Sequence, residues 1–225
     1  AGRRVEFLGL IEKILLLPER TGYEPGEVYS YELIAGLYET SGYLIRKAGN
    51  YSLAAESFYN ALPYTNGPKY EKMLWYWYNS LVRSSPYEAI TKIELLLGLW
   101  TDPDYFNDIF NELATVFVKN EQWRIIKDIL EYIQYSGPLD SVSKYAYLTA
   151  RAGMESYINI ERTEINRLFK LAFDSAYGLA SGLYYRILAG VHLEIPNSQW
   201  IFNDTAASQP LTVKEEADGS FDLLY

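Results

Sequence analysis

The chain has 225 residues, of which 49% are hydrophobic and 22% are charged, a balance typical of folded proteins rather than disordered ones. Its 20 basic and 29 acidic residues give a net charge of −9, which disfavours nucleic acids and anionic lipids as partners. The absence of cysteine excludes disulfides, thiolate metal sites and a cysteine nucleophile.

No segment of the sequence is long and apolar enough to cross a bilayer. The apolar runs at 14–17 and 95–97 fall far short of the roughly 20 residues that a spanning helix needs. We therefore expect no membrane insertion. No signal peptide is visible, and the start at Ala1-Gly2 without Met predicts an excised fragment, from which targeting information can be missing.

Apolar spacing and turn residues predict a succession of helices. The first covers Arg3–Leu17, and the last covers Tyr177–Leu193. Pro86 and Asp102-Pro103 fit helix starts, because a proline in the first turn loses no hydrogen bond. Between the first and last helices we expect four helix pairs, at 27–47 and 52–62, 69–83 and 86–98, 103–119 and 121–135, and 141–157 and 163–173.

The second helix of each pair carries a repeated pattern of apolar residues. In the clearest copy, Ala54, Phe58 and Ala61 give a small–large–small face that follows the turn Gly49-Asn50. The corresponding sets begin at residues 89, 126 and 165, in steps of 35, 37 and 39. Helix pairs that repeat in the mid-thirties resemble tetratricopeptide-like repeats.

The first helices carry a small residue where two backbones are expected to approach closely. Gly42, Ala114 and Gly153 occupy this position in three of the pairs. Trp77 stands there in the second pair, so we expect that pair to be splayed or shifted.

The resemblance to tetratricopeptide-like repeats implies an all-α fold, a right-handed α-solenoid of about four to five helix hairpins. The repeat domain would cover residues 1–196, and residues 197–225 would form a short irregular C-terminal tail or a linker. Such arrays present a curved surface to another molecule. The expected function is therefore a non-catalytic scaffold or adaptor that binds a protein or peptide.

In the family that the chain resembles, the first helix of each pair lines a ligand-binding groove. Glu39 stands where a cation would be needed to clamp a terminal carboxylate, so acidic chaperone tails are not expected ligands. The mixture of tyrosine, apolar and polar residues favours an extended or helical peptide, although each tyrosine can instead pack against a neighbouring hairpin. The groove positions are Glu39, Tyr43, Arg46, Lys47, Leu74, Tyr78, Leu81, Asn111, Thr115, Lys119, Ala150, Met154 and Tyr157. The residues expected to contact the partner are Tyr43, Arg46, Lys47, Tyr78, Asn111, Lys119 and Tyr157.

A second resemblance lies near the end of the chain. The segment Gly-Leu-Tyr-Tyr-Arg-Ile-Leu-Ala-Gly-Val-His-Leu at 182–193 is similar to a Tyr-Tyr-x-x-Leu-Ala-x-x-x-Leu helix of soluble lytic transglycosylases, outside their catalytic domain. It implies an alternative function: the helical domain of a protein of the bacterial periplasm or cell envelope, with peptidoglycan as a partner and a catalytic domain beyond residue 225. A carrier of a small molecule or lipid, working with a transporter, is a third alternative.

Few residues suggest catalysis. Glu155-Ser156 resembles the catalytic acid of lytic transglycosylases, but 158–171 contains no Gly-Leu-Met-Gln-type segment, so Glu155 is expected to be an exposed or groove-lining carboxylate. His192 is the only histidine, too few for a usual zinc site. No phosphate-binding glycine loop occurs. We therefore expect no enzyme activity, cofactor or metal.

Overall fold

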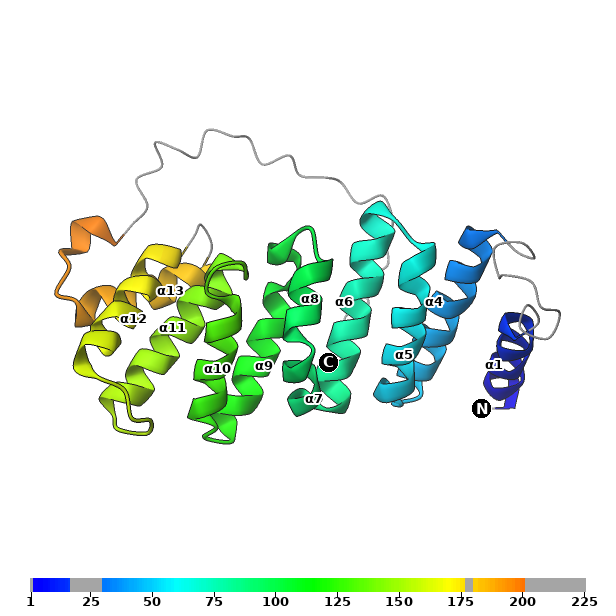
Figure 1. Ribbon diagram of the computed structural model, residues 1–225, viewed down its shortest axis with the longest axis horizontal. Helices are drawn as coiled ribbons and strands as arrows, with labels where there is room; N and C mark the ends of the chain where they lie inside the picture. Colours follow the sequence, from blue (N-terminus) through cyan, green and yellow to red (C-terminus); the bar gives the residue numbers. More distant parts are fainter. Residues whose placement is uncertain (1, 17–29, 177–179, 201–225) are drawn as a thin grey trace.

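The structure, a computed structural model, describes residues 2–16, 30–176 and 180–200. These residues form α-helices joined by turns and short 3₁₀ segments, and they contain no strand (Figure 1). Of the tail expected at 197–225, the structure describes 197–200, which contain a 3₁₀ turn at Asn197–Gln199. Residues 201–225 and the predicted helical residues at 17, 27–29 and 177–179 lie outside the described residues. The helices are α1 Gly2–Leu15, α4 Tyr31–Lys47, α5 Tyr51–Ala61, α6 Gly67–Ser84, α7 Pro86–Thr91, α8 Ile93–Leu99, α9 Asn107–Lys119, α10 Trp123–Ile133, α11 Leu139–Met154, α12 Arg162–Ser175 and α13 Ala180–His192.

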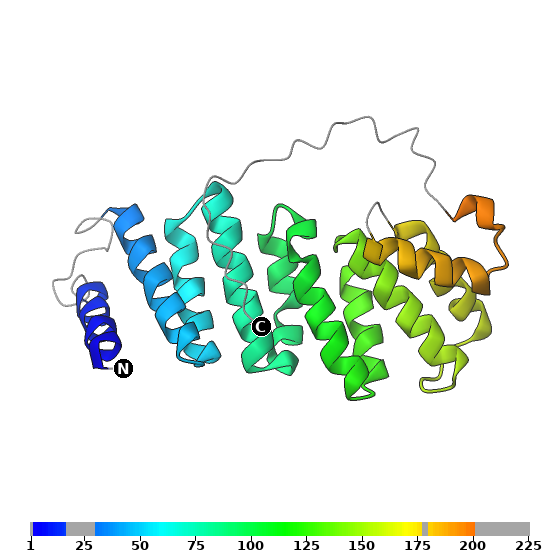
Figure 2. The same ribbon diagram turned by 180° about the vertical axis from the view of Figure 1, so that it is seen from behind.

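From α1 to α12 the helices follow one another along the long axis of the molecule in the order of the sequence, and α13 packs across α11 and α12 (Figures 1 and 2). Each packs mainly on its neighbours in the chain, as α4 does on α5, α5 on α6, α10 on α11, and α11 on α12. We call α4, α6, α9 and α11 the first helices, and α5, α7–α8, α10 and α12 the second helices. The turns that join first to second helices all lie along one edge, the lower edge in Figure 1.

The first helices begin at a constant interval. Their starts are Tyr31, Gly67, Pro103 and Leu139, each 36 residues after the one before. The third start is a 3₁₀ turn, Pro103–Phe106, that runs directly into α9. The steps of 35, 37 and 39 residues between the second helices are uneven because the turns that connect first to second helices differ in length.

Side-chain caps explain several of these starts. Ser30 accepts a hydrogen bond from the backbone N–H of Leu33 at the start of α4, and Asn50 accepts one from Leu53 at the start of α5. Ser85 caps α7 immediately before Pro86. The predicted starts at Pro86 and at Asp102-Pro103 are confirmed.

The apolar pattern of the second helices forms the core. All three members of every predicted set are buried, from Ala54, Phe58 and Ala61 to the set at 165, 169 and 172. They belong to a single cluster of buried side chains that runs from α5 to α13. In the first pair the core confirms the close approach at Gly42, which faces the ring of Phe58.

The second helix pair differs from its prediction. The expected helix at 86–98 is two short helices, α7 and α8, which meet at Lys92. The hydroxyl of Tyr78 donates a hydrogen bond of 2.8 Å to the carbonyl of Ala89. In a continuous helix the N–H of Ile93 would donate to that carbonyl. A side chain that inserts into the backbone hydrogen bonds of a helix in this way is a recognised cause of a helix break.

The small position of the second pair is also corrected. At the constant interval of 36 residues, Gly42 corresponds to Tyr78, Ala114 and Ala150, all of them buried. The large residue at this position is therefore Tyr78, one residue after the predicted Trp77, and the fourth small residue is Ala150 instead of Gly153. Gly153 still approaches a neighbour closely, because a Cβ there would collide with the side chain of Ile160.

Candidate functional site

Polar side chains join the four first helices to one another. Five of these contacts link residues that lie 33 positions apart: Lys72 with Glu39, Arg46 with Asn79, Asn79 with Glu112, Trp75 with Asp108, and Lys144 with Asn111. We call these residues the polar ladder. Because the interval stays the same from α4 to α11, the ladder holds the four helices in one register.

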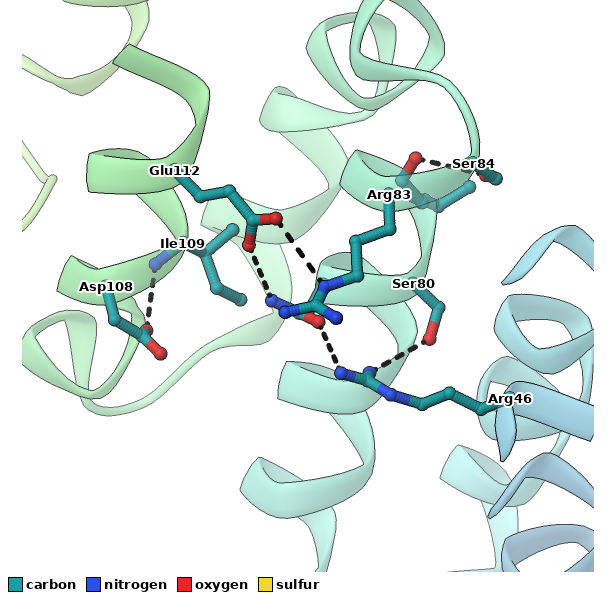
Figure 3. A network of polar contacts seen from close by, with 9 residues as sticks. Arg46, Ser80, Arg83, Ser84, Asp108, Ile109 and Glu112 are labelled. Atoms are coloured by element: carbon teal, nitrogen blue, oxygen red, sulfur yellow. Dashed lines mark hydrogen bonds and ion pairs between the residues drawn. The ribbon is translucent and has the colours of Figure 1, made fainter. Parts of the chain in front are cut away.

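Arg46, on α4, begins the longest connected part of the ladder (Figure 3). Its Nη2 donates to Oδ1 of Asn79 at 2.8 Å, and its Nη1 donates to Oγ of Ser80 at 3.3 Å. Nδ2 of Asn79 donates in turn to Oε2 of Glu112 at 3.2 Å, and Nε of Arg83 lies 3.5 Å from Oε1 of the same carboxylate. Three helices thus share one chain of charged and amide groups.

The surroundings of Arg46 explain its electrostatics. Its guanidinium lies 5.2 Å from the ring centroid of Tyr76 and 5.9 Å from that of Tyr51. Burial lowers the pKa of Arg46, and the neighbouring charge of Arg83 lowers it further. Asn79, which accepts from Arg46, is only 3% exposed. The neutral amide of Asn79 therefore stands between the guanidinium of Arg46 and the carboxylate of Glu112. The three side chains must be correctly oriented as well as correctly charged to form this network.

Glu39, in the middle of α4, gathers a second set of charges. Its carboxylate lies 3.2 Å from Nζ of Lys69 and 3.4 Å from Nζ of Lys72, and it accepts a hydrogen bond from the hydroxyl of Tyr43. Burial alone would raise the pKa of Glu39, but the hydrogen bonds and charges of the two lysines outweigh it and lower the pKa. Glu39 is therefore an ionised link between α4 and α6.

The predicted partner-contacting residues lie in several different environments. Lys47 and Lys119 are exposed at the ends of α4 and α9. Tyr157 is 62% exposed, and its ring stacks on that of Trp123 at a centroid distance of 5.4 Å. Tyr43, Arg46 and Asn111 are half-buried, and the contacts of the polar ladder and of Glu39 occupy their polar atoms.

Tyr78 is wrongly placed by the sequence prediction. It is fully buried, and its hydroxyl donates a hydrogen bond to the carbonyl of Ala89. Burial also raises the pKa of its hydroxyl. Leu74, Leu81 and Ala150, three other predicted groove positions, are buried as well. The error arose because the family positions were transferred without the constant interval of the first helices, which assigns Tyr78 to the core.

The sequence analysis missed most of the polar ladder. Asn79, Glu112, Trp75, Asp108 and Lys144 were not predicted to contribute to a site. A signal existed in the sequence, because Arg46, Asn79 and Glu112 are polar residues at equal intervals of 33. The repeated apolar residues do not share this interval, so they did not predict it.

The residues that suggested catalysis have structural contacts. Glu155 is exposed at the end of α11 and pairs with Arg151 at 2.8 Å. The ring of His192 stacks on Phe169 at 4.5 Å, and burial together with the charge of Arg151 lowers its pKa. Among the described residues, no group of three histidine, aspartate or glutamate side chains is placed to hold a metal ion. Within the same residues no helix has the length and apolar character needed to cross a bilayer.

Comparison with known proteins gave no relative. No protein family, no curated protein and no solved structure matches this chain. The two resemblances noted in the sequence therefore supply hypotheses about function, and the chain is assigned to neither family.

Proposed function

We propose that this chain is a tetratricopeptide-like α-solenoid that acts as a non-catalytic scaffold or adaptor, binding a protein or peptide along its first helices. The main support is the polar ladder, which joins four successive first helices at one interval of 33 residues. A regular register of this kind produces a continuous surface over several repeats, the type of surface that helical-repeat proteins use for extended partners.

The contacting residues differ in part from those predicted in the sequence. Lys47, Lys119 and Tyr157 are retained because their side chains are exposed. Thr115, which was predicted as a groove position, is included among them, because it is exposed one turn after Asn111 on α9 and so lies beside the polar ladder. Arg46 serves mainly to fix the register of the surface.

Site-specific photo-crosslinking tests this proposal. A photoreactive amino acid would replace Thr115 on a first helix or, as the matched control, Tyr132, which is 37% exposed on second helix α10. We expect a protein partner to be crosslinked in native cells from position 115 and not from 132. Crosslinks of equal yield from both positions, or only from 132, would contradict binding along the first helices.

A second candidate function is the helical domain of a cell-wall lytic enzyme. One observation favours it: the segment 182–193 that resembles those enzymes lies almost entirely in α13, which packs on α11 and α12 at the end of the array. Purification of the intact gene product with its native ligands would separate the two functions. Recovery of murein fragments without a protein partner would favour the cell-wall function.

A further inference from the structure

Three cations occupy equivalent positions at the ends of successive first helices. Lys47, Arg83 and Lys119 are 36 residues apart, which is the interval between the helix starts, and all three are exposed. They lie in the last turns of α4, α6 and α9, along the edge that carries the turns to the second helices (Figure 1). The next position in the series is Glu155, which pairs with Arg151. We call the three cations the edge row.

Within the described parts of the chain, the edge row is poorly neutralised. No carboxylate there lies within 4.0 Å of the ammonium group of Lys47 or Lys119. Arg83 reaches Glu112 through Nε alone, so the N–H groups of its two terminal nitrogens remain for another acceptor. A cation in the last turn is favoured by the helix dipole, but the dipole does not require the same position in three helices.

A shallow hollow lies beside Arg83, the second member of the edge row. Its volume is about 450 Å³, and it lies between the turn 48–52 and the end of α6 at Arg83 and Ser84. Beside it, the guanidinium groups of Arg46 and Arg83 lie 5.9 and 5.8 Å from the ring centroid of Tyr51. Two cations held around one ring repel each other. Glu112 offsets part of that repulsion, and a carboxylate bound in the hollow would add to this effect.

The separation of the cations suggests the conformation of a ligand. Packed helices lie about 8–10 Å apart, and the hydrogen bonds of the polar ladder join side chains of successive first helices. From this we infer a separation of about the same size between neighbouring members of the edge row. A polyproline II segment advances about 9 Å in each three-residue turn, so every third side chain points to the same side. An acidic residue at every third position would therefore match the edge row.

We propose that the edge row binds an extended, polyproline II-like peptide segment with an acidic residue at every third position. The carboxylate that faces Arg83 enters the hollow beside Tyr51, and its neighbours along the peptide face Lys47 and Lys119. This inference rests on the proposed function, because it specifies the partner of the same array. It does not require a terminal carboxylate, so Glu39 does not oppose it.

Fluorescence anisotropy with labelled nonapeptides provides the test. The probe is (Glu-Pro-Pro)₃. One comparison peptide has three consecutive glutamates followed by six prolines, which keeps composition and charge, and the other is (Gln-Pro-Pro)₃. The protein variants are Lys47→Gln/Lys119→Gln and a matched control, Lys92→Gln/Lys170→Gln, which removes two exposed lysines from the second helices. Thermal melts of both variants verify that they fold.

We expect (Glu-Pro-Pro)₃ to bind more tightly than either comparison peptide, and more weakly as the salt concentration rises. Two exposed ion pairs correspond to a loss of about two- to tenfold in affinity for the Lys47/Lys119 variant, with less than a twofold change for the control. Equal binding of the peptide with consecutive glutamates, equal losses in both variants, or no binding would overturn the inference. If binding fails while position 115 still crosslinks a partner, the proposed function stands without the edge row.

Discussion

The close approach of α4 and α5 allows a prediction with an internal control. A Cβ added to Gly42 would lie 2.6, 2.7 and 2.9 Å from three atoms of the Phe58 ring. That ring is fully buried and packs against Tyr43 and Tyr76, with centroids at 5.4 and 5.0 Å. It therefore has little room to move away. Gly36, six residues earlier in the same helix, would meet nothing within 4 Å.

The two glycines should respond to alanine with opposite signs. Alanine is favoured over glycine inside a helix by about 0.8–1 kcal/mol, so Gly36→Ala should raise the free energy of unfolding by up to that amount. Overpacking of a core typically costs about 1–3 kcal/mol. Three simultaneous clashes put the cost of Gly42→Ala at the upper end of that range. After the gain in helix propensity is included, we expect the free energy of unfolding to fall by about 2 kcal/mol.

Urea denaturation followed by far-ultraviolet circular dichroism measures both changes. A double variant, Gly42→Ala/Phe58→Leu, tests the cause, because the smaller side chain should make the alanine less costly than it is beside phenylalanine. If Gly42→Ala is neutral or stabilising, or if its cost is the same whether position 58 carries leucine or phenylalanine, the close contact between these helices does not exist as described.

Three further predictions concern single residues. Tyr78→Phe should lower the free energy of unfolding by about 1 kcal/mol. It should also slow hydrogen exchange at the N–H of Ile93, because the carbonyl of Ala89 would then be shared only with the N–H of Lys92; unchanged exchange there would contradict our explanation of the helix break. Glu121→Gly should raise the free energy of unfolding by about 0.5–1 kcal/mol, because φ at Glu121 is +56°, a conformation that glycine adopts without strain. The control is Asn120→Gly: φ at Asn120 is −97°, so glycine should lower the free energy of unfolding in the same urea titration. The pKa of Glu39 is lower in the folded protein, so its stabilising contribution is present above the unfolded pKa and is lost as the pH falls through the folded pKa. Glu39→Gln should therefore reduce the fall in stability between pH 7 and pH 3, and an equal fall in both proteins would exclude this role.

Much of the fold could be predicted from local signals. The apolar sets of the second helices, the turn at Gly49-Asn50 and the starts at Pro86 and Asp102-Pro103 all appear in the structure. These features depend on residues that are neighbours along one helix or turn. Their spacing therefore carries the information directly.

The candidate surface could be predicted only in part. Lys47, Lys119 and Tyr157 are exposed, because each stands at or just beyond the end of a helix, and their contact with a partner stays a prediction. Arg46 was predicted without its partners. Its contacts with Asn79 and Ser80 join residues that are 33 and 34 positions apart, and these contacts exist only once two helices have packed.

Local spacing along the chain was enough to predict which segments are helical, where most of them begin, and which face of each second helix is buried. The packing of the helices was needed to show that Tyr78 faces the core and breaks the second helix of its pair at Lys92. It was also needed to show that Asn79 stands between Arg46 and Glu112. The physical reason is that helical periodicity fixes the direction of a side chain only to within a face about 100° wide. The offset between packed helices, which selects one partner within that face, is set by the close packing of both helices together.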